Sequence, residues 1–297
     1  MKIFVEIGRT AVKASRSALR DRISALEDAG ATGVSVSDHM FTSNGGPGGG
    51  RRLQCDPLTT LAAVAGLSDR LELLTIVMNT GWLHPAFILR QFSQLALLVG
   101  GERVTAGIGA GWNAEEFAAI GLRMSPFAER MERFEETLQI ARQLYGSRQA
   151  NFEGEYVVVR DLPLSPVPAT PPRLLVGGGS ERALELAGRY ADVVDLQGHP
   201  KYGHLVGSTA EKAAADVRRR ALTTIADLQE RMSVVGEAAK TAGRAPGSVQ
   251  ASVQVSYVAY WSKYDRERME RAFYADWAKV DGPPLTENPF VLGGGAT

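Results

Sequence analysis

The chain has 297 residues, 44% of them hydrophobic and 22% charged, and its formal net charge is zero. This length fits one large α/β barrel or two medium domains. The balanced charge argues against a nucleic-acid or membrane-surface partner. The single cysteine, Cys55, excludes an internal disulfide and suits a reducing compartment, and the N-terminal MKIFVEIG lacks a signal-peptide core, so we expect a cytoplasmic protein.

Short apolar runs alternate with amphipathic stretches along the first half of the chain, a pattern typical of repeated βα units. The predicted elements, in chain order, are a strand at Lys2 to Gly8, a helix at Ser15 to Ala29, a strand at Val34 to Ser37, a glycine-rich loop at Ser43 to Arg52, a helix from Asp56 to Leu67, a strand at Leu71 to Met78, a helix at Pro85 to Val99, a strand at Val104 to Ile108, a short helix opened by Ala114, and a long helix at Pro126 to Leu144.

Residues 145–172 interrupt this alternation and are interpreted as an insertion. Asn151 to Asp161 predicts a hairpin that turns at Glu153-Gly154, and a proline-rich connector follows at Pro163 to Pro172. The alternation then resumes with a strand at Leu174 to Val176, a helix at Glu181 to Arg189, a strand at Val193 to Leu196, a helix over Ala210 to Ala242 with Gly236 as a possible interruption, a strand at Val249 to Ala259, and a helix at Asp265 to Lys279.

Repeated βα units predict a parallel sheet buried on both faces, and we expect one (β/α)8 TIM barrel over residues 1–297. The only segment left for an eighth strand is Phe290 to Leu292, with nothing helical after it. Either this is a poor eighth strand, or the chain stops before its last βα unit.

The most informative stretch is RVTAGIGAGWNAEEFAAIG, Arg103 to Gly121, in which a strand runs through Gly109, Ala110 and Gly111 into a helix. Glycine turns of this kind bring backbone N–H groups and a helix N-terminus close to a bound cofactor, although they also occur for packing alone. A second such turn, Gly178-Gly179-Ser180 with Arg182 one turn into the helix, indicates a phosphate cradle, with a tight capped turn as the alternative.

Only a few side chains are candidates for a catalytic or ligand-binding role. His39 ends a strand beside Asp38, and histidine is suited to exchanging a proton near neutral pH. His84 either caps a helix or lines the site. His39, His84, His199 and His204 do not show the spacing of metal ligands, so we predict no metal site. Trp82 and Trp112 end strands, where they either shape a substrate pocket or pack at the rim. The basic run Arg218-Arg219-Arg220 is interpreted as a solvated helix face.

Four segments, GVSVSDHM, RLELLTIVMNT, LLVGGERVTAGIGAGWNAEEF and LLVGGGSERALELAGRYAD, occur in an order and spacing that resemble the luciferase-like monooxygenase superfamily. The chain is most similar to actinobacterial oxidoreductases that use the deazaflavin coenzyme F420. The resemblance implies a barrel with its site at the C-terminal ends of the strands, F420 as cofactor with FMN as the alternative, a small-molecule substrate and a homodimer.

The resemblance also implies roles for single residues. Asp38 would contact the deazaflavin and His39 would serve proton transfer. Ile76-Val77 falls where many members have a non-prolyl cis peptide behind the ring system, and Asn79 matches a polar cofactor contact. Ala110 and Gly111 would lie along the ring, and Gly178, Gly179, Ser180 and Arg182 would bind phosphate.

At one position the chain departs from the family pattern, and this limits which activity can be carried over from the family. Sugar-phosphate dehydrogenases of this group have a glutamate where this chain has Trp112, so we do not carry over their glucose 6-phosphate activity. The expected function is hydride transfer between F420 and a small organic substrate. An FMN-dependent monooxygenase and a catalytically silent cofactor binder are the alternatives.

Overall fold

The computed structural model describes residues 1–8, 15–43, 51–163, 168–203, 209–254, 257–261 and 291–295. The chain forms two compact units: Met1–Gly177 with Tyr190–Asp192, and Gly178–Arg189 with Val193–Thr297. Within the described ranges, no helix combines the length and apolarity needed to cross a membrane.

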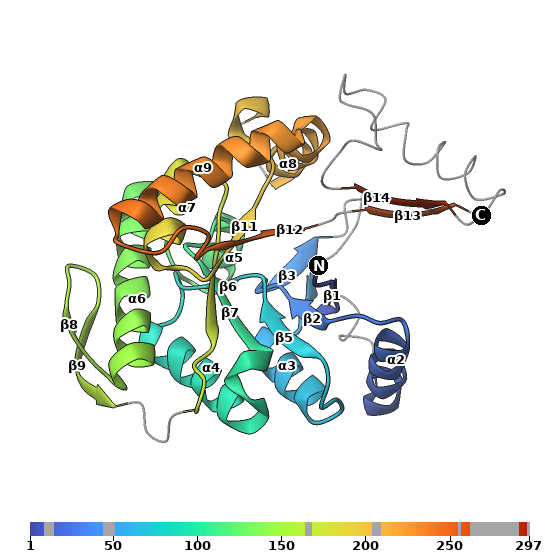
Figure 1. Ribbon diagram of the computed structural model, residues 1–297, viewed down its shortest axis with the longest axis horizontal. Coiled ribbons are helices and arrows are strands. Elements are labelled where there is room, and N and C mark those ends of the chain that lie inside the picture. Colours follow the sequence, from blue (N-terminus) through green and yellow to red (C-terminus); the bar gives the residue numbers. More distant parts are fainter. Residues whose placement is uncertain are drawn as a thin grey trace. The chain divides into compact units, whose positions relative to one another are not determined.

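The first unit contains a parallel sheet in the order β1-β2-β5-β7-β10, as drawn in Figure 1. Its strands are β1 (Phe4–Glu6), β2 (Gly33–Val36), β5 (Glu72–Thr75), β7 (Val104–Gly109) and β10 (Arg173–Gly177). β2 and β7 are buried along their whole length, as expected of strands covered on both faces. The predicted strand at Leu71 to Met78 is divided, because β6 (Met78–Asn79) pairs separately with the end of β7.

The described helices of the first unit, except α6 (Phe127–Ser147), begin at a capping side chain. They are α2 (Arg16–Asp28), α3 (Pro57–Ala65), α4 (Pro85–Val99), α5 (Ala114–Ala119) and α6, with a 3-10 turn η1 (Gly101–Arg103). Ser15, Asp56 and His84 accept a backbone N–H at the starts of α2, α3 and α4. α4 has the predicted bounds and ends at Gly100, whose φ of 90° is accessible to glycine.

Two hairpins project from the first unit. β8 (Gln149–Glu153) and β9 (Val158–Pro163) confirm the predicted hairpin, but its turn begins at Gly154 because Glu153 still pairs with Val158. Glu136 of α6 accepts backbone N–H groups from this turn. β3 (Phe41–Ser43) pairs antiparallel with β4 (Arg51–Leu53), so both ends of the segment Ser43 to Arg52 are strands and the expectation of a fully irregular loop was wrong there. The glycine-rich middle, 44–50, lies outside the described residues.

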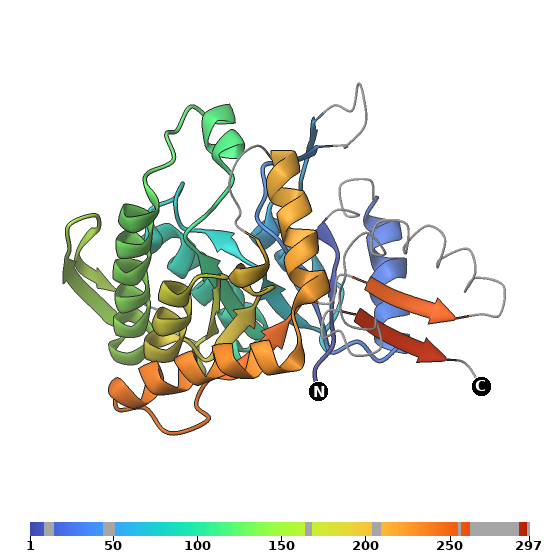
Figure 2. The same ribbon diagram turned by 90° about the horizontal axis from the view of Figure 1, so that it is seen from above.

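The second unit contains α7 (Glu181–Tyr190), β11 (Val193–Leu196), the 3-10 turn η2 (Pro200–Tyr202), α8 (Thr209–Leu222), α9 (Ile225–Thr241) and β12 (Gln250–Val253). β11 and β12 pair in parallel. α7 and α9 lie side by side in both views (Figure 1, Figure 2), because Gly188 lets the backbone at Val235 and Ala239 approach closely.

The single long helix predicted over Ala210 to Ala242 is wrong, because α8 and α9 are separate. The break falls at Thr223-Thr224 and not at Gly236, which lies inside α9. Thr224 and Asp227 form a capping box, in which each side chain accepts the other residue's backbone N–H. The threonines therefore begin a new helix where the glycine only lowers helix propensity.

The predicted strand Val249 to Ala259 is also divided. After β12, β13 (Tyr257–Trp261) pairs in parallel with β14 (Val291–Gly295) in a sheet of their own. β14 overlaps the candidate eighth strand at Phe290 to Leu292, but among the described residues its strand partner is β13 and not β11 or β12. The helix predicted at Asp265 to Lys279 lies outside the described residues.

Candidate functional site

The candidate site of the first unit lies at the carboxyl ends of its parallel strands. Asp38 and His39 follow β2, Asn79 ends β6, and Ala110 and Gly111 follow β7. Parallel strands present these ends at one edge of the sheet, which is where open and barrel-forming α/β proteins bind ligands.

His39 is held by a glutamate that the sequence analysis did not single out. Its Nδ1 lies 2.9 Å from Oε1 and 3.2 Å from Oε2 of Glu116, on the first turn of α5. Glu116 is 2% exposed. The Trp112 ring meets the imidazole edge-on at a centroid distance of 6.0 Å. A buried carboxylate therefore fixes one nitrogen of the imidazole and leaves Nε2 without a hydrogen-bond partner among the described residues.

Asp38 is tied to the strand ends beside it. Its Oδ2 accepts hydrogen bonds from the backbone N–H of Asn79 at 2.8 Å and from Trp82 Nε1 at 3.2 Å. Burial raises the pKa of this carboxyl to about 6, against the lowering effect of these two hydrogen bonds. Asp38 is thus fixed in place and able to change its protonation state near neutral pH.

The space taken by the Val77 side chain explains why glycines occupy the ends of β7 and β10. The Ile76–Val77 peptide is cis, as the family resemblance implies. A Cβ on Gly109 would lie 2.8 Å from Val77 Cγ2, and a Cβ on Gly177 would lie 2.7 Å from Val77 Cγ1. Only residues without a side chain fit at these two strand ends, so Val77 forms a small apolar surface over both.

The Gly111 turn is held by polar contacts. Gly111 has a φ of 74°, and a Cβ there would lie 2.4 Å from Asn79 Oδ1, so the turn requires glycine on both grounds. Asn79 Oδ1 also accepts the N–H of Gly81 at 2.8 Å. Arg130 of α6 donates a hydrogen bond to the Gly111 carbonyl and so ties the turn to α6.

The two tryptophans differ in setting. Trp82 packs on Phe117 at a centroid distance of 5.3 Å and donates to Asp38, whereas Trp112 is 44% exposed. The first unit therefore brings together six of the predicted site residues: Asp38, His39, Asn79, Trp82, Gly111 and Trp112. His84 is the N-cap of α4, with its Nδ1 accepting the N–H of Ala86 at 3.3 Å.

The predicted phosphate turn, Gly178 to Ser180, belongs to the second unit. Ser180 Oγ accepts the N–H of Ala183 at 3.2 Å at the start of α7. Arg182 forms a half-exposed ion pair with Glu185 at 3.2 Å. Arg231 of α9 also reaches the turn, because its Nη2 donates to the Gly179 carbonyl at 3.0 Å.

The basic run on α8 was interpreted wrongly in part. Arg218 is exposed, but Arg219 is only 6% exposed and donates through Nε to the Gly203 carbonyl at 2.6 Å. The acidic residues nearby in sequence suggested a solvated face. The signal for burial was Gly198, which allows the backbone after β11 to contact α8 at Arg219.

Known proteins share this architecture. The sequence model of the luciferase-like monooxygenase family matches residues 2–289, so the chain belongs to that family. A solved F420-dependent secondary alcohol dehydrogenase superposes with a TM-score of 0.69 at 17% identity, over 94% of this chain and 76% of that one. This confirms the expected TIM-barrel-like fold class.

Curated relatives include enzymes with either cofactor. An F420-dependent hydroxymycolic acid dehydrogenase of Mycobacterium tuberculosis is 32% identical over 228 residues, covering 74% of this chain and 59% of that protein. An FMNH2-dependent dimethylsulfone monooxygenase of Pseudomonas fluorescens is 25% identical over 247 residues, covering 75% and 66%. The chain spans 38% to 59% of the length of the first curated relatives it matches.

Family members are oxidoreductases and monooxygenases that depend on a deazaflavin or a flavin. Among the described residues, no group of acidic, histidine or cysteine side chains is arranged to hold a metal ion.

Proposed function

We propose that this protein is an F420-dependent oxidoreductase that transfers a hydride between the deazaflavin and a small organic substrate. The observation that carries the proposal is the His39–Glu116 pair at 2.9 Å, which provides a proton-exchanging group at the strand ends where the family binds its cofactor. The 32% identity to a deazaflavin-dependent dehydrogenase, against 25% to an FMNH2-dependent monooxygenase, favours the deazaflavin.

The residues present fit a planar ring system. Gly109 and Gly177 keep the ends of β7 and β10 free of side chains beside Val77, and Gly111 does the same at the following turn. We propose Asp38, Ile76, Val77, Asn79, Ala110 and Gly111 as the residues that hold the ring, and Gly178, Gly179, Ser180 and Arg182 as the phosphate turn. When bound, the deazaflavin would supply hydride donation or acceptance at its C5.

His39 then has a defined role. An ionised carboxylate only accepts hydrogen bonds, so Glu116 keeps the proton of a neutral imidazole on Nδ1 and leaves the Nε2 lone pair free. In this form Nε2 accepts a proton from a substrate hydroxyl. In the reverse direction, the protonated imidazole donates from Nε2 to a carbonyl oxygen. Glu116 positions the ring in both directions, and Trp112 limits the access of water to its edge.

The second candidate is an FMN-dependent monooxygenase. It is favoured by the match to the dimethylsulfone enzyme, which covers 75% of this chain. The same strand ends and the same glycines would serve a flavin ring, and Trp82 or Trp112 would then shape the pocket for the organic substrate.

The test is an assay of purified protein with each cofactor in parallel. Oxidised F420 with a panel of primary and secondary alcohols reports deazaflavin reduction, and reduced FMN with oxygen and the same panel reports substrate oxygenation. We expect turnover in the first arm that is lost in His39→Ala. Turnover confined to the FMN arm would favour the second candidate, and cofactor binding without turnover in either arm would indicate a silent binder.

A further inference from the structure

Two arginines of the second unit are buried without an anionic partner. Arg219 on α8 is 6% exposed and Arg231 on α9 is 4% exposed. Among the described residues, neither forms an ion pair with a carboxylate, and Arg231 Nε has no hydrogen-bond partner at all. A buried guanidinium is costly unless its charge is compensated, so an arrangement with two of them calls for an explanation.

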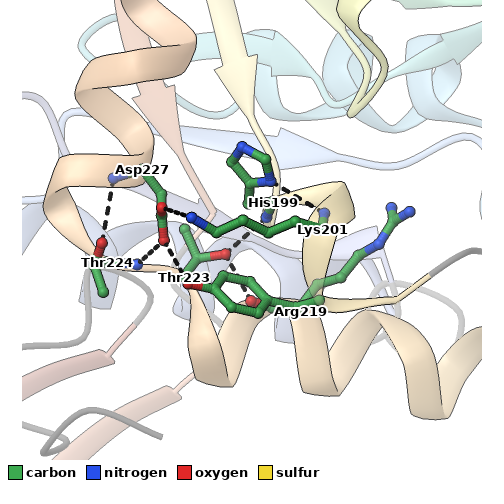
Figure 3. Close-up of polar contacts among 7 residues, drawn as sticks. His199, Lys201, Arg219, Thr223, Thr224 and Asp227 are labelled. Atoms are coloured by element: carbon green, nitrogen blue, oxygen red, sulfur yellow. Dashed lines mark hydrogen bonds and ion pairs between the residues drawn. The ribbon is translucent and has the colours of Figure 1, made fainter.

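The carboxylates nearest to these arginines along α8 and α9 are paired elsewhere or exposed. Asp227 is bonded to Lys201 Nζ, the Tyr202 hydroxyl and the Thr224 N–H, and Figure 3 shows the Arg219 side chain directed away from it. Asp216 is paired with Arg220 at 2.9 Å, and Glu230 is exposed. The polar contacts in Figure 3 therefore hold the α8–α9 junction together and include no carboxylate paired with Arg219.

Both guanidinium groups lie at the Gly179 turn. Arg231 Nη2 donates to the Gly179 carbonyl at 3.0 Å, and Arg219 Nη1 lies 3.7 Å from the place that a Cβ on Gly179 would occupy. The turn leads into α7, whose helix dipole also favours an anion at this end. Burial and the mutual proximity of the two charges lower the pKa of Arg231, which is the opposite of what a carboxylate partner would do.

We propose that Arg219 and Arg231, together with the Gly179 turn, form an anion site that binds a phosphate group. Guanidinium forks match the oxygens of phosphate in geometry and in charge. The proposal deepens the proposed function, on which it rests only for the source of the phosphate: the cofactor side chain or a phosphorylated substrate. It adds the charge of these two arginines to the turn, where Arg182 is also paired with Glu185.

Inorganic phosphate is the probe that needs no knowledge of the cofactor. Thermal unfolding of the full chain is followed in phosphate-free buffer with increasing phosphate, against chloride at matched ionic strength. Ligand that binds only the folded state raises the midpoint with concentration. We expect this rise in the parent and in Arg218→Met, the exposed neighbour on α8. In Arg219→Met and Arg231→Met the phosphate affinity should fall by about tenfold to a hundredfold, the effect of losing a charge-assisted hydrogen bond.

No phosphate-specific rise in the parent, or an equal rise in the two methionine variants, would overturn the proposal. Should a methionine variant fail to fold, Arg219→Gln and Arg231→Gln remove the charge but keep a polar side chain, and a phosphate response equal to that of the parent would overturn it equally.

A second titration identifies the source. The deazaflavin coenzyme and its phosphate-free chromophore are compared in the parent and in the arginine variants. Weaker binding of the coenzyme alone assigns the site to the cofactor phosphate. Unchanged binding of both, with the phosphate response lost, assigns it to a phosphorylated substrate. Because the phosphate arm uses no cofactor, it stands even if the proposed cofactor does not bind.

Discussion

Nδ1 of His39 lies 2.9 Å from the buried Oε1 of Glu116, although the two residues are 77 positions apart in the sequence. The strand ends of β2 and β7 bring them together, and the first turn of α5 carries the carboxylate. The contact gives the histidine a fixed orientation and a defined free nitrogen. It also places a buried carboxylate beside the histidine at the candidate site.

Removing the imidazole should reduce catalysis more than removing its orienting carboxylate. We expect His39→Ala to lower the single-turnover rate by about 100-fold or more, as is usual when a general acid or base is lost. Glu116→Gln should cost about tenfold, since an amide holds the ring but does not fix the proton on Nδ1. Cofactor affinity should change little in either variant.

The neighbouring Glu115, on the same turn of α5, provides the matched control. Glu115→Gln should retain the parent rate. If Glu116→Gln and Glu115→Gln are both indistinguishable from the parent in single turnover, Glu116 has no role in orienting His39.

Asp38 should make stability depend on pH. Burial raises its pKa in the folded chain to about 6, above the usual 3.8 of an aspartate carboxyl, so between these values the folded chain keeps a proton that the unfolded chain releases. Stability from this group is therefore present at low pH and is lost as pH rises from about 4 to about 6, by at most about 3 kcal/mol. Asp38→Asn should flatten this part of the curve of unfolding free energy against pH.

Exposed Asp69 serves as the reference, because its substitution by Asn should leave the curve unchanged. Buried Asp195, whose pKa burial also raises to about 6, should contribute in the same direction. A parent whose stability rises steadily through this pH window would contradict the assignment.

The contact of Val77 with the strand-end glycines predicts a compensating pair. Gly109→Ala places a methyl 2.8 Å from Val77 Cγ2 and should destabilise the fold by about 1–3 kcal/mol, as overpacking usually does. Val77→Ala should relieve most of this loss in the double variant. Gly146→Ala, in the open part of α6, should be neutral or slightly stabilising. Strict additivity of the two substitutions in chemical denaturation would refute the contact.

The capping box at the α8–α9 junction predicts a local stability effect. Thr224→Ala removes the side-chain acceptor for the Asp227 N–H and should cost about 1–2 kcal/mol in unfolding free energy. Ser233→Ala, at an exposed position inside α9, should have a much smaller effect. Equal denaturation midpoints for these two variants would show that the break between the helices is not set by the cap.

Local signals were sufficient to predict most of the fold. Helices α3 and α4 begin at Asp56-Pro57 and His84-Pro85, where a cap and a proline stand together, and glycine residues follow their ends. The strands of the first unit are short apolar runs between such helices. The division of the long helix at Thr223-Thr224 was missed, because its cap depends on a reciprocal side-chain contact within an otherwise continuous helical pattern.

The candidate site was predictable only where it follows a strand end. Asp38, His39, Asn79 and Gly111 could be located in this way. Glu116 could not, because nothing in sequence distinguishes it from Glu115 until the helix is placed under His39. Arg219 was missed for a similar reason, since burial of one arginine in a basic run depends on which face of α8 meets the loop after β11.

The most direct test of the proposed function is a side-by-side titration of the cofactor-free protein with F420 and with FMN, followed by quenching of cofactor fluorescence. We predict tighter binding of F420 than of FMN, with the preference retained in His39→Ala and Glu116→Gln, because these side chains act on the substrate proton and not on the cofactor. Tighter binding of FMN, or no binding of F420, would contradict the proposed function.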